Sequence, residues 1–245
     1  MANRPGNKRS IWADWKIGAK LTAIILIVTL LSISALVAVN YWMNVNQTTQ
    51  QIGGQLVMLG DDVVLRAADQ VFGGLKVLET LARTPSLVEA VKQANLDRAS
   101  LTETDIAALD KDWQDKNPTI EPTIQEIESN NLTGYLKEFI KQNPDEIEVF
   151  VTDIKGLNIA MTNRTSDFLQ GDEGWWKSTF AEGKGSSFIA AVEYDDSSKA
   201  YAMNLGVPIY DKESQKVIGV LRGTLDVSLL FKTLGNVKIG ETGSA

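Results

Sequence analysis

The sequence predicts an α+β protein in which helices precede an antiparallel sheet. Up to residue 142, apolar residues recur at spacings of three and four, which is the period of an amphipathic helix. From residue 147 onward, short β-branched and aromatic runs separated by turn residues are typical of strands. A long apolar run without charge lies near the N-terminus, at residues 21–42. Helices followed by strands in this order predict helices packed on one side of a sheet.

Residues 21–42 are predicted to form a transmembrane helix, because at about 1.5 Å per residue they span a hydrocarbon core of roughly 30 Å. Lysine and arginine are frequent in residues 1–20 and absent from residues 43–60. This asymmetry predicts a cytoplasmic N-terminus and a main domain outside the membrane. Tyr41 and Trp42 stand where an outer aromatic belt is expected. The alternative is a cleaved signal peptide, but the run is long for one and has no clear cleavage site.

A long helix that emerges from the membrane is predicted over residues 43–84, where Pro85 should end it. Its apolar stripe could pack on its own domain or on a second copy of the chain. Three shorter helices are expected, with the second capped at Thr102 or Thr104. They cover residues 86–94, 102–116 and 121–142.

Five strands, mostly antiparallel, are expected after the helices. A D-x-x-G turn separates the first two strands, and the segment DDSSK separates the third from the fourth, so both pairs are predicted hairpins. The predicted strands are residues 147–153, 157–162, 188–194, 200–210 and 216–227.

Composition excludes several classes of function. The 245 residues include no Cys and no His, which excludes disulfides, zinc sites with His or Cys ligands, and Ser-His-Asp or Cys-His catalysis. The net charge is −7 and no basic stripe is present, so nucleic-acid binding is not expected. Paired acids could indicate a glycosidase, but nothing places two of them across a cleft. The sequence therefore predicts a protein that is not an enzyme and needs no metal or cofactor.

The segment GDEGWWKSTF, at residues 171–180, places two tryptophans side by side in an expected loop. Adjacent side chains diverge, so one tryptophan can reach the core while the other faces a different environment. Acidic residues surround them in the neighbouring loops, namely Asp172, Glu173, Asp195 and Asp196. Aromatic faces and carboxylates favour a cationic or amine-bearing ligand. The alternative is that the tryptophans are packing anchors and that the acids form a solvated rim.

The order of these motifs resembles the extracytoplasmic double-Cache sensor domains of bacterial receptors. The resemblance rests on VFVTDIKGLNIAMT, the WW pair, VPIYD and VIGVLRGTLDVSLL, and KIGAKLTAIILIVTLL resembles the first anchor of methyl-accepting chemotaxis proteins. It implies an inner-membrane chemoreceptor with a periplasmic, PAS-like ligand-binding module at residues 85–230. Residues 231–245 resemble the start of a truncated second module. A histidine kinase, a cyclic-dinucleotide enzyme, or a structural module without a ligand remain alternatives.

The resemblance also implies a set of ligand-binding residues. In amino-acid-binding members of the family, a loop carries Tyr, Arg, Trp and Tyr or Phe at the positions of Phe168, Glu173, Trp175 and Trp176. Tyr194 and Asp196 resemble a Tyr-x-Asp pair, and an amine-binding Asp of the family falls near Thr224 and Asp226. Because Glu173 replaces the Arg and none of these residues is basic, we expect an amine-bearing ligand. A homodimer through the long helix is also expected.

Overall fold

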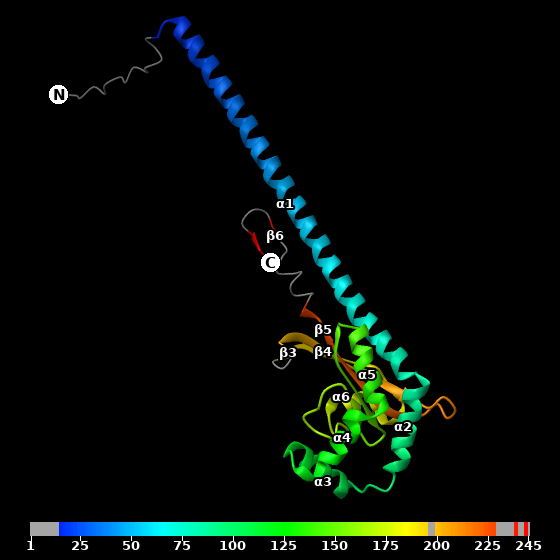
Figure 1. Ribbon diagram of the computed structural model, residues 1–245. Coiled ribbons are helices and arrows are strands. Elements are labelled where there is room, and N and C mark those ends of the chain that lie inside the picture. The colour runs from blue at the N-terminus through cyan, green and yellow to red at the C-terminus, as the bar shows by residue number, and fades with distance from the viewer. Residues whose placement is uncertain (1–14, 196–198, 229–237, 240–242, 245) are drawn as a thin grey trace, which may run out of the picture. The chain divides into compact units, whose positions relative to one another are not determined.

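The computed structural model describes residues 15–195, 199–228, 238–239 and 243–244, and it confirms the α+β class (Figure 1). The helices are α1 (Ile17–Ala82), α2 (Pro85–Asp97), α3 (Glu103–Gln114), α4 (Glu121–Ser129), α5 (Asn131–Gln142) and α6 (Gly174–Phe180), with two short 3₁₀ helices, η1 (Pro118–Ile120) and η2 (Ala181–Gly183). The strands are β1 (Glu146–Asp153), β2 (Asn158–Met161), β3 (Phe188–Asp195), β4 (Ala200–Tyr210), β5 (Val217–Asp226), β6 (Lys238–Ile239) and β7 (Gly243–Ser244).

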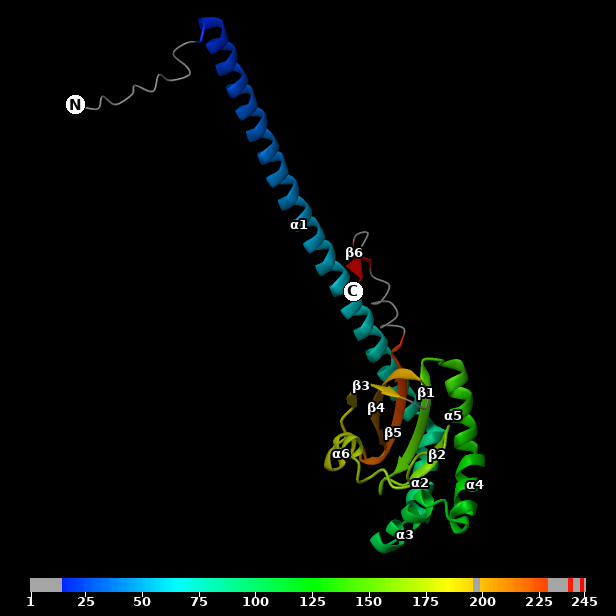
Figure 2. The same ribbon diagram turned by 90° about the vertical axis from the view of Figure 1, so that its left-hand side faces the viewer.

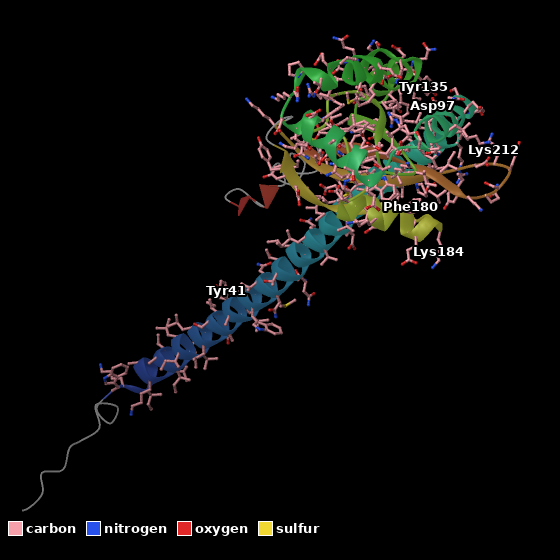
Figure 3. All side chains as sticks on the ribbon, turned by 90° about the horizontal axis from the view of Figure 1, so that it is seen from below. Tyr41, Asp97, Tyr135, Phe180, Lys184 and Lys212 are labelled. Atoms are coloured by element: carbon pink, nitrogen blue, oxygen red, sulfur yellow. The ribbon has the colours of Figure 1, made fainter. Side chains whose placement is uncertain are left out.

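The chain divides into two compact units, Met1–Gly60 and Asp61–Ala245. The described part of the first unit is almost entirely the N-terminal part of α1. Its apolar side chains are exposed, and Tyr41 points away from the helix axis (Figure 3). Among the described residues, α1 is the one helix long and apolar enough to cross a membrane. That finding rests on length and composition alone, a test that a signal sequence would also pass.

The second unit is built on a five-stranded antiparallel sheet of order β2-β1-β5-β4-β3 (Figure 2). The two predicted hairpins, β1–β2 and β3–β4, are confirmed, and β5 lies between them. β5 is hydrogen-bonded to a strand along each of its two edges, and its side chains alternate between the two faces of the sheet.

One face of the sheet packs on the C-terminal part of α1, on α2 and on α5, and we call it the α1 face. Val149 and Val151 of β1 and Leu221 of β5 point to this side, where they join Leu78 of α1 and Leu136 of α5 in the larger hydrophobic core. Buried aliphatic side chains from helices and strands make this the principal structural core of the unit.

The opposite face carries Phe150 and Thr152 of β1 and Arg222 and Thr224 of β5, and we call it the Trp face because α6 covers part of it. A second hydrophobic cluster extends from Phe150 to the edge of the sheet. It joins residues of α3, η1, α4, β2 and the segments on either side of β2, namely Trp113, Ile120, Ile124, Ile127, Leu157, Met161 and Phe168.

Glycines permit close approaches at two points of this face. Gly206 of β4 lies under Thr179 of α6, so a Cβ at that position would collide with the threonine side chain. Gly156 has a φ of +81° in the predicted D-x-x-G turn, a conformation that favours glycine. A Cβ there would also collide with the backbone of Gly171, which brings the segment containing α6 close to the sheet.

The structure corrects two predicted elements. The single helix expected over residues 121–142 is two helices, α4 and α5, because Asn130 adopts extended backbone angles and its side chain caps α5 by accepting from the backbone N–H of Thr133. The WW segment is not a loop, since Gly174–Phe180 form the short helix α6.

Candidate functional site

The two adjacent tryptophans of α6 have different environments. Trp176 is 6% exposed, its indole N–H donates to Thr152 Oγ1 at 2.9 Å, and its ring stacks on Phe180 with centroids 4.7 Å apart. Figure 3 labels Phe180, where α6 ends. Trp176 is therefore the side chain that anchors α6 on the sheet.

Trp175 is half-buried and lies beside a guanidinium group. Its ring meets Phe150 edge-on, with centroids 5.7 Å apart and an angle of 82° between the planes. Arg222 Cζ lies 5.2 Å from the ring centroid of Trp175 and 5.4 Å from that of Phe150. These distances allow cation–π attraction to both rings. Trp175, Phe150 and Arg222 therefore form one aromatic–cationic group on the Trp face.

Arg222 is absent from the set expected from the sequence, although its spacing to Thr224 and Asp226 places all three on one face of a strand. None of the residues expected from the sequence is basic, whereas this face of the sheet also carries the guanidinium group of Arg222. The alternation within VLRGTLD was the signal that could have identified Arg222, because it lies two and four positions before the expected residues.

The next positions along β5 are polar and then acidic. Thr224 is buried, and its hydroxyl donates to Asn204 Oδ1 of β4 at 3.0 Å. Asp226 is half-buried and accepts from the backbone N–H of Ser228 at 2.8 Å. At about 3.3 Å per strand residue, the Cα atoms of Arg222 and Asp226 are roughly 13 Å apart. The face thus changes from cationic to acidic over the length of a small molecule.

Strand register adds two more carboxylates to the acidic part. Glu148 of β1 is paired with Thr224, so it shares the face of that threonine. Glu193 of β3 and Asp226 of β5 are both paired with Ala202 of β4, which puts their side chains on the same side of the sheet. Neither Glu148 nor Glu193 belongs to the set expected from the sequence.

Tyr194 does not lie on the Trp face as expected, because the strand register places its side chain on the α1 face. The pairing of β3 with β4 shifts by one residue between Ile189 and Val192. A one-residue shift reverses the direction of every later side chain. Tyr194 is therefore paired with Tyr201, packs edge-on against its ring at 5.3 Å, and is 53% exposed. The structure does not bring Tyr194 together with Trp175, and Asp196 lies outside the described residues.

The two remaining expected residues lie at the margins of the Trp face. Phe168 is 1% exposed and stacks on Trp113 with centroids 5.3 Å apart, and Arg98 Cζ lies 5.3 Å from the centroid of the Phe168 ring. Phe168 borders a separate cavity of about 530 Å³ between α2 and α4. Glu173 is exposed and directly precedes α6.

The described part of the chain contains no group of three or more His, Cys, Asp or Glu residues able to hold a metal ion. The Trp face offers a ligand aromatic surface, hydrogen-bonding groups and charges of both signs.

No family model and no curated protein matches the chain. Among solved structures, the ligand-binding domain of the Pseudomonas aeruginosa PAO1 amino-acid chemoreceptor PctC in complex with GABA is similar, with 15% identity and a TM-score of 0.47 over 78% of this chain and 69% of that one. The Vibrio cholerae histidine kinase DctB sensor domain has 14% identity and a TM-score of 0.44 over 74% of this chain and 60% of that one.

The ligand-binding domain of the Campylobacter jejuni chemoreceptor Tlp3 in complex with 4-methylisoleucine is similar at 18% identity and a TM-score of 0.36, over 66% of this chain and 64% of that one. This chain thus spans about two thirds of the length of the three structures. All three are sensor or ligand-binding domains of chemoreceptors or histidine kinases.

Proposed function

We propose that this chain is the sensor part of a membrane-anchored chemoreceptor and that it binds a small amine-bearing molecule on the Trp face of its sheet. The observation that carries the proposal is the convergence of Trp175, Arg222 and Asp226 on one sheet face, around the Thr224–Asn204 hydrogen bond. The α1 face, by contrast, packs into the larger hydrophobic core, so the two faces of the sheet differ in chemical character.

The ligand class follows from the charges along β5. An ammonium group is favoured near Asp226 and Glu193, whose carboxylates lie on the same side of the sheet. The aromatic surface of Trp175 adds attraction for a cation. A carboxylate at the other end of the same ligand would meet Arg222, which can bind a carboxylate with two N–H groups. Compounds with both groups are therefore favoured over plain dicarboxylates.

Calorimetry on the full chain in detergent micelles tests this assignment with simple amines, amino acids and dicarboxylates. Trp175→Ala and Asp226→Asn should each weaken binding of the tightest amine by about 1–3 kcal/mol, because a charged group loses its contact. Arg222→Gln should weaken amino acids but have little effect on simple amines.

Tyr194→Ala is the matched control, since Tyr194 lies on the α1 face and its loss should leave the affinity unchanged. A dicarboxylate as the tightest ligand, or unchanged affinity in both the Trp175 and Asp226 variants, would overturn the assignment of the site. An effect of Tyr194→Ala as large as that of Trp175→Ala would show that the wrong face of the sheet has been chosen.

A histidine kinase or a cyclic-dinucleotide enzyme could use the same sensor. The reading frame beyond codon 245 in the source genome distinguishes these outputs, because a long methylation-type coiled coil indicates chemotaxis and a catalytic core indicates the others. A structural module without a ligand is tested by a thermal-shift screen of small metabolites. Any compound that raises the melting temperature counts against a purely structural role, since a ligand stabilises the state that it binds.

A further inference from the structure

A buried acid lies on the α1 face, away from the proposed ligand site. Glu146, at the start of β1, is 3% exposed, and neither of its carboxyl oxygens has a hydrogen-bond partner among the described residues. It is paired with Leu225, a residue of the larger hydrophobic core. An ionised carboxylate without a partner is costly in such a place, so the neutral acid is favoured.

Two glycines make room for this carboxyl group. A Cβ on Gly74 of α1 would lie 3.3 Å from Glu146 Oε1, and a Cβ on Gly223 of β5 would lie 2.8 Å from Oε2. The carboxyl group is therefore packed between the helix and the strand. Gly73 and Gly74 also weaken α1 at this point, because glycine costs about 1 kcal/mol relative to alanine inside a helix.

The surroundings of Glu146 are acidic. It borders a cleft of about 350 Å³ between α1 and the turn that precedes β1. The titratable groups lining this cleft are Asp69 of α1 and Asp145 of the turn, while α5 contributes Gln142 and β5 contributes Leu225. No basic side chain lines the described cleft. Burial, together with the negative charge of Asp145, raises the pKa of Glu146 to about 8.

We propose that Glu146 is a proton-controlled contact between α1 and the sheet. In its neutral form the carboxyl group lets the Gly73–Gly74 segment of α1 pack against β5. When the proton is lost, the carboxylate needs water, and this segment of α1 separates locally from β5. Ambient pH is then a second input to the domain, independent of a ligand on the Trp face.

Hydrogen exchange on the full chain in lipid nanodiscs tests this proposal between pH 5 and pH 9. After correction for intrinsic exchange, the opening equilibrium of residues 70–78 should rise about tenfold per pH unit up to about pH 8, because the closed state binds one proton more. The Glu146→Gln variant should show no such rise. Asp145→Asn, which keeps Glu146 and removes its charged neighbour, is the matched control and should keep most of the rise.

Equal pH dependence in wild type and Glu146→Gln, or its absence from wild type, would overturn the proposal. Infrared spectroscopy of the wild type provides a second measurement that does not depend on the variant. A protonated-carboxyl band should persist at pH 7 and disappear above pH 8. Absence of this band at pH 7 would also overturn it. Neither outcome affects the proposed ligand site.

Discussion

Single side chains give the two faces of the sheet different electrostatic properties. On the Trp face, Arg222 stays charged between two aromatic rings, where its interaction with their faces offsets part of its lost hydration. On the α1 face, Glu146 has no such partner among the described residues and is favoured in its neutral form. The same two strands therefore carry a guanidinium group on the Trp face and a buried neutral acid on the α1 face.

This difference predicts how the stability of the protein depends on pH. The unfolded state releases the Glu146 proton near pH 4.5, whereas the folded state keeps it until about pH 8. Between these values the folded state binds more protons, so its stability falls by about 1.4 kcal/mol per pH unit as the pH rises. Urea denaturation at pH 5, 6.5 and 8 measures the free energy of unfolding. The Glu146→Gln variant should lack this pH-dependent contribution, so its free energy of unfolding should exceed that of the wild type most at pH 8.

If the free energy of unfolding of Glu146→Gln equals that of the wild type at all three pH values, a group other than Glu146 controls the pH dependence of stability. Asp69→Asn is a suitable comparison, because Asp69 borders the same cleft.

At the residue scale, the sequence predicts the types of side chain better than their directions. Adjacent tryptophans had to diverge, but only the contact with Thr152 shows that Trp176 is the anchor and Trp175 the residue beside Arg222. Strand alternation predicts the shared face of Thr224 and Asp226. It fails for Tyr194, because the irregularity after Ile189 leaves no clear mark in the sequence.

At the scale of elements, residue propensities together with helix-capping and helix-breaking residues predict most boundaries of helices and strands. Pro85 ends α1 as expected, and Thr102 caps α3 in a reciprocal bond with Asp105. The break at Asn130 is less predictable, since it depends on tertiary structure as well as capping. Its side-chain amide donates to the backbone carbonyl of Ile159 in β2 at 2.8 Å, a contact between residues far apart in the sequence.

The helix α1 presents two different surfaces within the second unit. Leu75, Leu78 and Ala82 pack into the larger core, which confirms packing of the stripe on its own domain. Leu65 and Phe72, seven residues apart and so on one side of the helix, are 64% and 62% exposed. Large apolar side chains exposed along one line favour contact with a second copy.

We expect this second copy to be detected by cysteine cross-linking, because the chain has no Cys of its own. Phe72→Cys in membranes should give a disulfide-linked dimer under mild oxidation, since symmetric contact along α1 brings equivalent positions within disulfide range. Lys212→Cys is the control, as Lys212 lies in the exposed β4–β5 turn (Figure 3). Equal cross-linking at both positions would indicate random collision. Cross-linking at neither position would contradict a dimer through α1.

At the scale of the whole molecule, the main question is on which side of a membrane the second unit lies. Charge around residues 21–42 is distributed unequally, with Lys and Arg concentrated before the run and absent from residues 43–60. Positively charged flanks are retained on the cytoplasmic side during insertion. The absence of charge from the run makes it suitable for the hydrocarbon core, and the polar surface of the sheet domain requires water. Together these features predict that the second unit lies outside the membrane and the N-terminus inside.

Reporter fusions after Gly60 measure this orientation directly. A reporter that is active only in the periplasm should be active at this position, and one that is active only in the cytoplasm should be silent, because the apolar run stops in the membrane with its basic flank inside. Replacing Lys16 and Lys20 by Gln while placing two Lys residues after Trp42 should lower the periplasmic signal, since the charge bias is then reduced. Activity of the cytoplasmic reporter in the wild type would contradict this orientation. A mature N-terminus beginning after Ala35 would instead show that the run is a cleaved signal peptide and that the sensor is not anchored by it.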